Sequence, residues 1–143
     1  MSWSKSIALL VGLGIYAFAA NAQVSLVKDG KPQCVVVISA KPTQTARYAA
    51  EELVKHINLS TRVKLAIEPE SGLDDQIQTH VYIGETETAL RYGIDAASLP
   101  REAFIMRSVG NDLFIVGKES EADPMDESNP NVGTLFGVYN FLE

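Results

Sequence analysis

The apolar run Cys34-Val35-Val36-Val37-Ile38 constrains the fold more than any other stretch of this chain. Its consecutive β-branched residues predict a strand over Gln33–Ser39 that is buried on both faces. Directly after it, Pro42-Thr43 provides the start of a predicted helix. One face of this helix is predicted to be an apolar stripe of Ala46, Ala49, Ala50, Leu53, Val54 and Ile57. The opposite, polar face carries Arg47, Glu51, Glu52 and Lys55. The small alanines would let the helix lie close to a sheet.

Shorter apolar runs separated by turn residues predict the remaining elements. In chain order these are a strand Val24–Val27 with a turn at Lys28–Pro32, a strand Val63–Ile67, a surface loop Glu68–Thr79, a strand Val81–Gly84 and a helical turn or two over Thr86–Tyr92. The runs Ala103–Ser108 and Asp112–Gly117 follow, and because they are joined around Gly110-Asn111 they predict a β-hairpin. The acidic, proline-containing segment Glu119–Asn131 predicts a solvated loop.

The final segment GTLFGVYNFLE, Gly133–Glu143, predicts a helix that is apolar on more than one side. The i, i+3, i+4, i+7 spacing of a stripe that packs on a sheet is met by Leu135, Val138, Tyr139 and Leu142. Phe136 and Phe141 lie towards the flanks of that stripe. A helix this apolar is normally buried on more than one side, so its second face needs something to pack against.

The first 22 residues have the organisation of a secretory signal peptide. A charged start, MSWSK, precedes the uncharged run SIALLVGLGIYAFAA and the small residues of Ala20-Asn21-Ala22. We expect cleavage after Ala22 and a secreted or periplasmic mature chain of residues 23–143. An uncleaved membrane anchor is the alternative, but the run has only about 15 residues where a span needs about 20.

Charge and the few reactive side chains exclude several classes of function. The formal net charge is −6, and removal of the signal peptide takes away Lys5 and no acid, which argues against nucleic acid and anionic membranes as partners. The single Cys34 is expected to be a buried strand residue, with a reactive thiol as the alternative. The two histidines, His56 and His80, lack zinc-site spacing, and no phosphate-binding glycine motif follows a strand. The loop acids Asp123, Asp126 and Glu127 resemble a calcium loop only loosely. We predict no cofactor and no metal.

Glu85 and Glu87 follow the predicted strand Val81–Gly84 and permit two interpretations. Paired carboxylates at the end of a strand could act as acid and base in glycoside hydrolysis. Acids in the first turn of a helix are also favoured by the helix dipole, and we prefer this second interpretation. No catalytic residue is therefore assigned. Asn58-Leu59-Ser60 matches a glycosylation acceptor.

The order of several motifs resembles a known family. RYAAEELVKHINLSTRVKLAI, HVYIGET, EAFIMRSVGNDLFIVGKE and GTLFGVYNFLE follow one another as in the N-terminal domain of family 67 α-glucuronidases. They are also similar to related bacterial polysaccharide-degrading proteins and to the second domain of β-hexosaminidases. The similarity spans roughly Val35 to Glu143. One departure is Asn131-Val132, where the family often has a basic residue just ahead of the glycine.

This resemblance implies an α/β fold, a two-layer sandwich in which helices pack against a mixed β-sheet. It implies an accessory, non-catalytic role in polysaccharide degradation for residues 23–143. In the family, the catalytic carboxylates belong to a (β/α)8 barrel that follows the final helix. The barrel would be the partner of this chain and would cover the second face of the helix, with polysaccharide as a further candidate partner.

Two other functions remain open at this point. The chain could be a free-standing secreted module that binds carbohydrate or a protein, although its only tryptophan, Trp3, lies in the signal peptide. It could also be a small independent enzyme, which the missing catalytic constellation makes the least favoured of the three. The length of the gene's reading frame beyond Glu143 would separate these alternatives.

Overall fold

The computed structural model describes residues 23–143 except 75 and 78, so the predicted signal peptide lies outside the described residues. The elements in chain order are β1 (Val27–Lys28), β2 (Lys31–Pro32), β3 (Val35–Ile38), α1 (Gln44–Thr61), β4 (Ile67–Pro69), a 3-10 turn (Glu70–Gly72), β5 (His80–Ile83), α2 (Glu87–Arg91), β6 (Phe104–Val109), β7 (Asp112–Gly117) and α3 (Gly133–Leu142). No helix among these residues is long and apolar enough to cross a membrane.

Five of the strands form one mixed sheet with the order β4-β3-β5-β7-β6. The first three neighbouring pairs are parallel, and β6 runs antiparallel to β7 as the predicted hairpin. The apolar run Cys34–Ile38 contains the interior strand β3, Val35–Ile38. Val35 and Val37 enter the core on one face of the sheet and Val36 enters the core on the other, which confirms burial on both faces.

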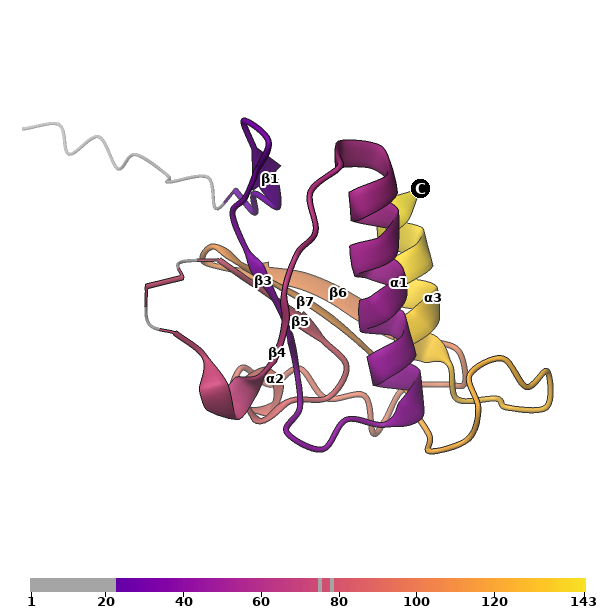
Figure 1. Cartoon of the computed structure of the whole chain (residues 1–143). Coiled ribbons are helices and arrows are strands. Elements are labelled where there is room, and N and C mark those ends of the chain that lie inside the picture. The colour runs from indigo at the N-terminus through magenta and orange to yellow at the C-terminus, as the bar shows by residue number, and fades with distance from the viewer. Residues whose placement is uncertain (1–22, 75, 78) are drawn as a thin grey trace, which may run out of the picture.

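The two longer helices cover one face of this sheet. Figure 1 shows α1 and α3 side by side, both beginning at the same end of the molecule. On the opposite face, α2 and the segment after it place Ala89, Ile94 and Ala96 against the sheet. The chain is therefore an α/β sandwich with helices packed against a mixed sheet, the fold that the family resemblance implies.

Helix α1 begins where the sequence predicts and differs from the prediction on its polar face. Thr43 is the N-cap, and its Oγ1 accepts the backbone N–H of Ala46 at 3.0 Å. Ala49 and Ala50 are fully buried against the sheet. Glu52, predicted to face outward, is only 8% exposed. The prediction was wrong at this position because α3 packs beside α1 and covers it.

Two glycines let α3 lie very close to the sheet. A Cβ added at Gly137 would come within 2.6 Å of Ile115 Cγ2, and one at Gly133 within 2.3 Å of the Ala103 carbonyl oxygen. Both distances are shorter than real Cβ contacts, so neither position has room for a side chain. The helix packs by its backbone at these points, a feature that the apolar spacing does not indicate.

Two predicted strands are shifted in the structure. Residues 24–26 form no strand, and β1 instead pairs with β2 across Asp29-Gly30, whose φ values of 51° and 71° suit a two-residue hairpin turn. The strand predicted at Val63–Ile67 begins only at Ile67, where β4 pairs with Val36. Val63 and Leu65 are buried, but their backbone crosses from α1 to the sheet edge without pairing.

Candidate functional site

A crevice lies at the carboxyl ends of β3, β5 and β7. The chain leaves β3 through α1 to β4 on one side and returns to β5 on the other side. In open α/β sheets, ligands bind at such a reversal of strand order, outside the carboxyl ends of the strands. The crevice has a volume of about 370 Å³.

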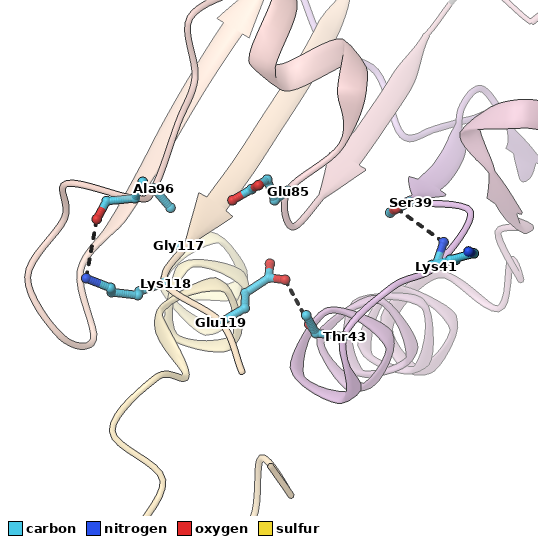
Figure 2. A pocket seen from close by; sticks show the side chains of 9 residues that line it. Ser39, Lys41, Thr43, Glu85, Ala96, Gly117, Lys118 and Glu119 are labelled. Carbon is cyan, nitrogen blue, oxygen red and sulfur yellow. Dashed lines mark hydrogen bonds between the residues drawn. The ribbon is translucent and has the colours of Figure 1, made fainter. Parts of the chain in front are cut away.

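Charged side chains from three strand ends line this crevice. Lys41 follows β3, Glu85 follows β5, and Lys118 and Glu119 follow β7. Figure 2 shows the carboxylates of Glu85 and Glu119 directed into the same space. Lys118 is held at one side, where its Nζ donates to the carbonyl oxygen of Leu99 at 3.1 Å.

Glu119 connects the beginnings of the two long helices. Thr43, the N-cap of α1, donates its hydroxyl to Glu119 Oε2 at 2.8 Å. Thr134, in the first turn of α3, donates its hydroxyl to Glu119 Oε1. Burial raises the pKa of the Glu119 carboxyl above its usual value, although the two hydroxyl groups partly oppose this shift. The carboxylate therefore acts as a link between helix ends.

Glu85 and Glu87, the pair considered from the sequence, are separated in the structure. Glu85 is exposed in the crevice, while Glu87 lies in the first turn of α2 beside a different hollow. The backbone N–H groups of Glu87 and Thr88 donate to Glu70 at 3.0 and 3.2 Å. Glu87 thus has the helix-start position of the preferred interpretation. For Glu85 that interpretation was wrong, because Glu85 precedes the N-cap Thr86 and lies outside the helix.

The sequence reasoning missed the carboxylate that does face Glu85. Glu119 was assigned to a solvated loop, yet it follows β7 as directly as Glu85 follows β5. Because β5 and β7 are parallel neighbours, their carboxyl ends bring the two acids to one edge. The signal that could have identified the pair is an acid just after each of two buried strands.

The other reactive side chains lie apart from the crevice. His56 Nε2 is 3.5 Å from Glu52 Oε2, and His80 Nδ1 is 3.0 Å from Asp112 Oδ1. Cys34 is buried, as predicted, and burial raises the pKa of its thiol to about 11, so it is protonated at neutral pH. Within the described residues, no three His, Cys, Asp or Glu side chains are placed to hold a metal ion.

A second hollow, which we call the α3 groove, lies between α3 and the loop of residues 119–131. It has a volume of about 300 Å³ and is lined by Met125, Val132, Phe136 and other residues of α3 and the loop. Met125 is 64% exposed and Phe136 is 40% exposed. Phe141, which the sequence also places at a flank of the apolar stripe, is instead partly buried against the domain's own core.

The loop beside this groove is held in place from within. Asn129 is only 7% exposed and accepts the hydroxyl of Ser120 at 3.0 Å. Its Nδ2 donates to the carbonyl oxygen of Asp123 at 3.2 Å. The side chain of Asp126 accepts the backbone N–H of Ser128 at 2.8 Å. The segment is acidic and mostly exposed, as predicted, but it is organised around one buried amide.

A scan of the chain against models of protein families finds no match, and a search of curated proteins finds none either.

Proposed function

We propose that residues 23–143 are a non-catalytic accessory domain of a secreted glycoside hydrolase that degrades polysaccharide, similar to family 67 α-glucuronidases. Catalysis would belong to a following barrel domain that packs against α3. The resemblance in motif order is the basis for this class. The observation in the structure that supports it is the outer surface of α3.

Phe136 carries this argument. It lies on α3, is 40% exposed, and borders an apolar groove beside the exposed Met125. Full burial of a phenylalanine or methionine stabilises a protein by about 1.5–3 kcal/mol relative to exposure. Apolar side chains gathered in this way are typical of a surface that another domain covers.

The crevice supports the same assignment for a different reason. Both oxygens of the Glu119 carboxylate accept hydroxyl groups that belong to helix starts. A general acid must instead lie within reach of a substrate oxygen. Glu85 is left exposed opposite a carboxylate that is already engaged. We therefore favour a structural role for the pair.

The alternative of a free-standing carbohydrate-binding module rests on Tyr92. This side chain is 50% exposed on the face opposite α3 and packs edge-on against Phe114 at a centroid distance of 5.6 Å. An exposed aromatic ring can stack on a sugar. If the chain binds polysaccharide by itself, Tyr92→Ala should abolish that binding and Phe136→Ala should not.

The test of the proposed function is the length of the gene. We expect the reading frame to continue past Glu143 for several hundred codons and to encode a barrel. In the longer polypeptide, α3 amides should exchange hydrogen more slowly than in residues 23–143 alone. A stop codon directly after Glu143 would contradict the proposal.

A second experiment addresses catalysis directly. The purified chain of residues 23–143 should hydrolyse neither glucuronoxylan fragments nor aryl glycosides. Turnover that disappears in Glu85→Gln or Glu119→Gln, but persists in Glu87→Gln, would assign an active site to the crevice. That result would replace the accessory role by the independent-enzyme hypothesis.

A further inference from the structure

We propose that the α3 groove receives an apolar side chain flanked by lysine or arginine on the surface of the following domain. The inference rests on the proposed function, which supplies the domain that presents this side chain. It adds the chemistry of the contact. Three features of the described residues lead to it: the apolar lining, the acidic rim and the fixed position of the loop.

The lining of the groove fits one large apolar side chain. Met125 approaches from the loop and Phe136 from α3, with Val132 between the two elements in the chain. A volume of about 300 Å³ is enough for a leucine or phenylalanine side chain. An apolar group placed there would cover Met125 and Phe136, the exposed apolar side chains of the lining.

The rim of the groove selects the charge of the partner. Glu102, Asp126 and Glu127 border the groove, and all three are exposed. None of the described residues that line it is basic. Complementary charge at the rim of an interface guides association and rejects partners of the same sign. The rim therefore favours a partner with lysine or arginine around its apolar contact.

The same rim argues against other occupants. A second copy of this chain would bring a second acidic rim, and a net charge of −6, against the first. Anionic lipid surfaces and nucleic acids would be repelled for the same reason. A basic protein surface is the partner that meets both the apolar lining and the acidic border.

The loop is organised before the partner arrives. Asn129 accepts the Ser120 hydroxyl and donates to the Asp123 carbonyl, which fixes both arms of the loop around one buried amide. Because Met125 and Glu127 lie between these fixed points, the groove keeps its shape without a ligand. A preformed groove lowers the conformational cost of binding.

A short capped peptide with one phenylalanine between pairs of arginines is the probe for this contact. We expect it to bind the purified chain and to shift the amide NMR signals of α3 and of residues 119–131. Met125→Ser and Phe136→Ser should each weaken binding by about tenfold. Leu59→Ser is the matched control, because Leu59 is 59% exposed at the far end of α1 and should leave binding unchanged.

The charge requirement has its own matched pair of variants. Glu127→Gln should weaken binding several-fold and reduce its dependence on salt. Glu121→Gln removes the same charge from the same loop outside the groove and should have a smaller effect. A peptide with glutamates in place of the arginines should not bind.

Several results would overturn the inference. They are absence of binding by the arginine peptide, equal binding by the glutamate peptide, full affinity in both serine variants, and a dimer of the free chain that Phe136→Ser dissociates. These outcomes are independent of the gene's length. A stop codon after Glu143 would remove the proposed function, while the peptide measurements alone decide whether the groove takes this chemistry.

Discussion

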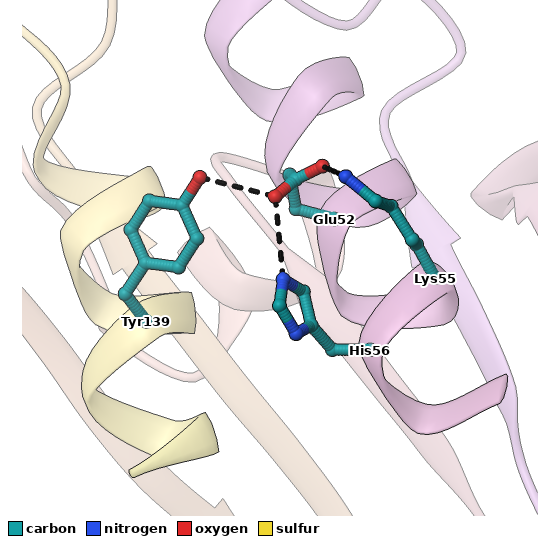
Figure 3. A network of polar contacts seen from close by, with 4 residues as sticks. All are labelled: Glu52, Lys55, His56 and Tyr139. Atoms are coloured by element: carbon teal, nitrogen blue, oxygen red, sulfur yellow. Dashed lines mark hydrogen bonds and ion pairs between the residues drawn. The ribbon is translucent and has the colours of Figure 1, made fainter. Parts of the chain in front are cut away.

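Glu52 and Glu119 both lie where α1 meets α3, and their surroundings shift the pKa values of the two carboxyl groups in opposite directions. Figure 3 shows Glu52 facing Lys55 and His56 of its own helix and Tyr139 of α3. Lys55 Nζ donates to Glu52 Oε1 at 2.8 Å. This hydrogen bond is the largest of the contributions that lower the pKa of the Glu52 carboxyl. Glu119 has hydroxyl groups around it and no basic side chain among its hydrogen-bond partners, so burial raises its pKa.

The difference teaches that burial does not decide the charge of a carboxyl group by itself. Both acids connect the same two helices. At Glu52 a nearby ammonium group outweighs desolvation, and at Glu119 desolvation outweighs two neutral hydroxyls. We therefore expect Glu52 to act as an ion and Glu119 mainly as a hydrogen-bonding group of the right shape.

Truncation of Glu119 should have the largest effect. Glu119→Ala leaves the hydroxyls of Thr43 and Thr134 without their partner and should lower the free energy of unfolding by about 1–3 kcal/mol. Glu119→Gln keeps the shape and should cost less than about 1 kcal/mol. Chemical denaturation of both variants measures this. Equal losses in both would mean that the negative charge at the two helix starts matters more than the hydrogen bonds.

The pH dependence of stability should separate the two acids by sign. Because the pKa of Glu52 is lowered in the folded chain, its carboxylate contributes stability above the unfolded-state pKa of about 4.3. This stability is lost as pH falls through the folded-state pKa. Because the pKa of Glu119 is raised in the folded chain, its carboxyl group contributes stability below the unfolded-state pKa. This stability is lost as pH rises through the folded-state pKa.

Two glutamine variants test this opposition. Relative to wild type, Glu52→Gln should lose stability as pH rises from about 3 to 6, whereas Glu119→Gln should gain stability over the same range. Thermal unfolding at a series of pH values gives both curves. Parallel curves would show that the two carboxyls respond to pH in the same way.

Removal of the Tyr139 hydroxyl should have a moderate effect. The hydroxyl group of Tyr139 donates to Glu52 Oε2 at 3.2 Å, and Tyr139→Phe should lower the free energy of unfolding by about 0.5–1.5 kcal/mol. Burial and the nearby Glu52 charge raise the pKa of Tyr139 to about 12, so the variant should also lose the latest step of a tyrosine absorbance titration. In a Glu52→Gln background the cost should shrink, since the charged acceptor is already gone.

Loss of Lys55 should have the smallest effect on stability. Its side chain is largely exposed, and exposed ion pairs contribute little because water and salt screen them. The sharper measurement is the pKa of Glu52 by NMR titration, which should rise in Lys55→Met. Lys31→Met removes an equal charge from β2, outside the hollow that Lys55 lines, and should leave the Glu52 titration unchanged. An unaltered Glu52 titration in Lys55→Met would mean that Tyr139 and His56 set its pKa.

Local pattern was enough to predict most elements, because the signals lie within one segment. The two runs of the β6–β7 hairpin and the cap at Thr43 are examples, and the structure has both within one residue of where the sequence places them. The start of β4 was not predictable in this way. It depends on where β3 offers a pairing partner, which is a property of the assembled sheet.

The candidate site was predicted less well for the same reason. The contact between Thr43 and Glu119 joins residues 76 positions apart, and the one between Glu52 and Tyr139 joins residues 87 apart. Nothing in the sequence around Glu52 or Glu119 indicates which distant residue each of them contacts. Glu52 has the spacing of an outward helical position and becomes buried only because α3 arrives beside it.

The place of α3 in the chain also sets an order of events during synthesis. Its backbone lies on β7 at Gly133 and Gly137, and it completes a core that β3 and α1 began almost a hundred residues earlier. A nascent chain that has reached only Asn131 leaves Ile115 and one flank of α1 in water. Contacts between distant segments form slowly because the intervening chain must first be closed into a loop. The ribosome must therefore release nearly all of α3 before β3 can reach its final surroundings.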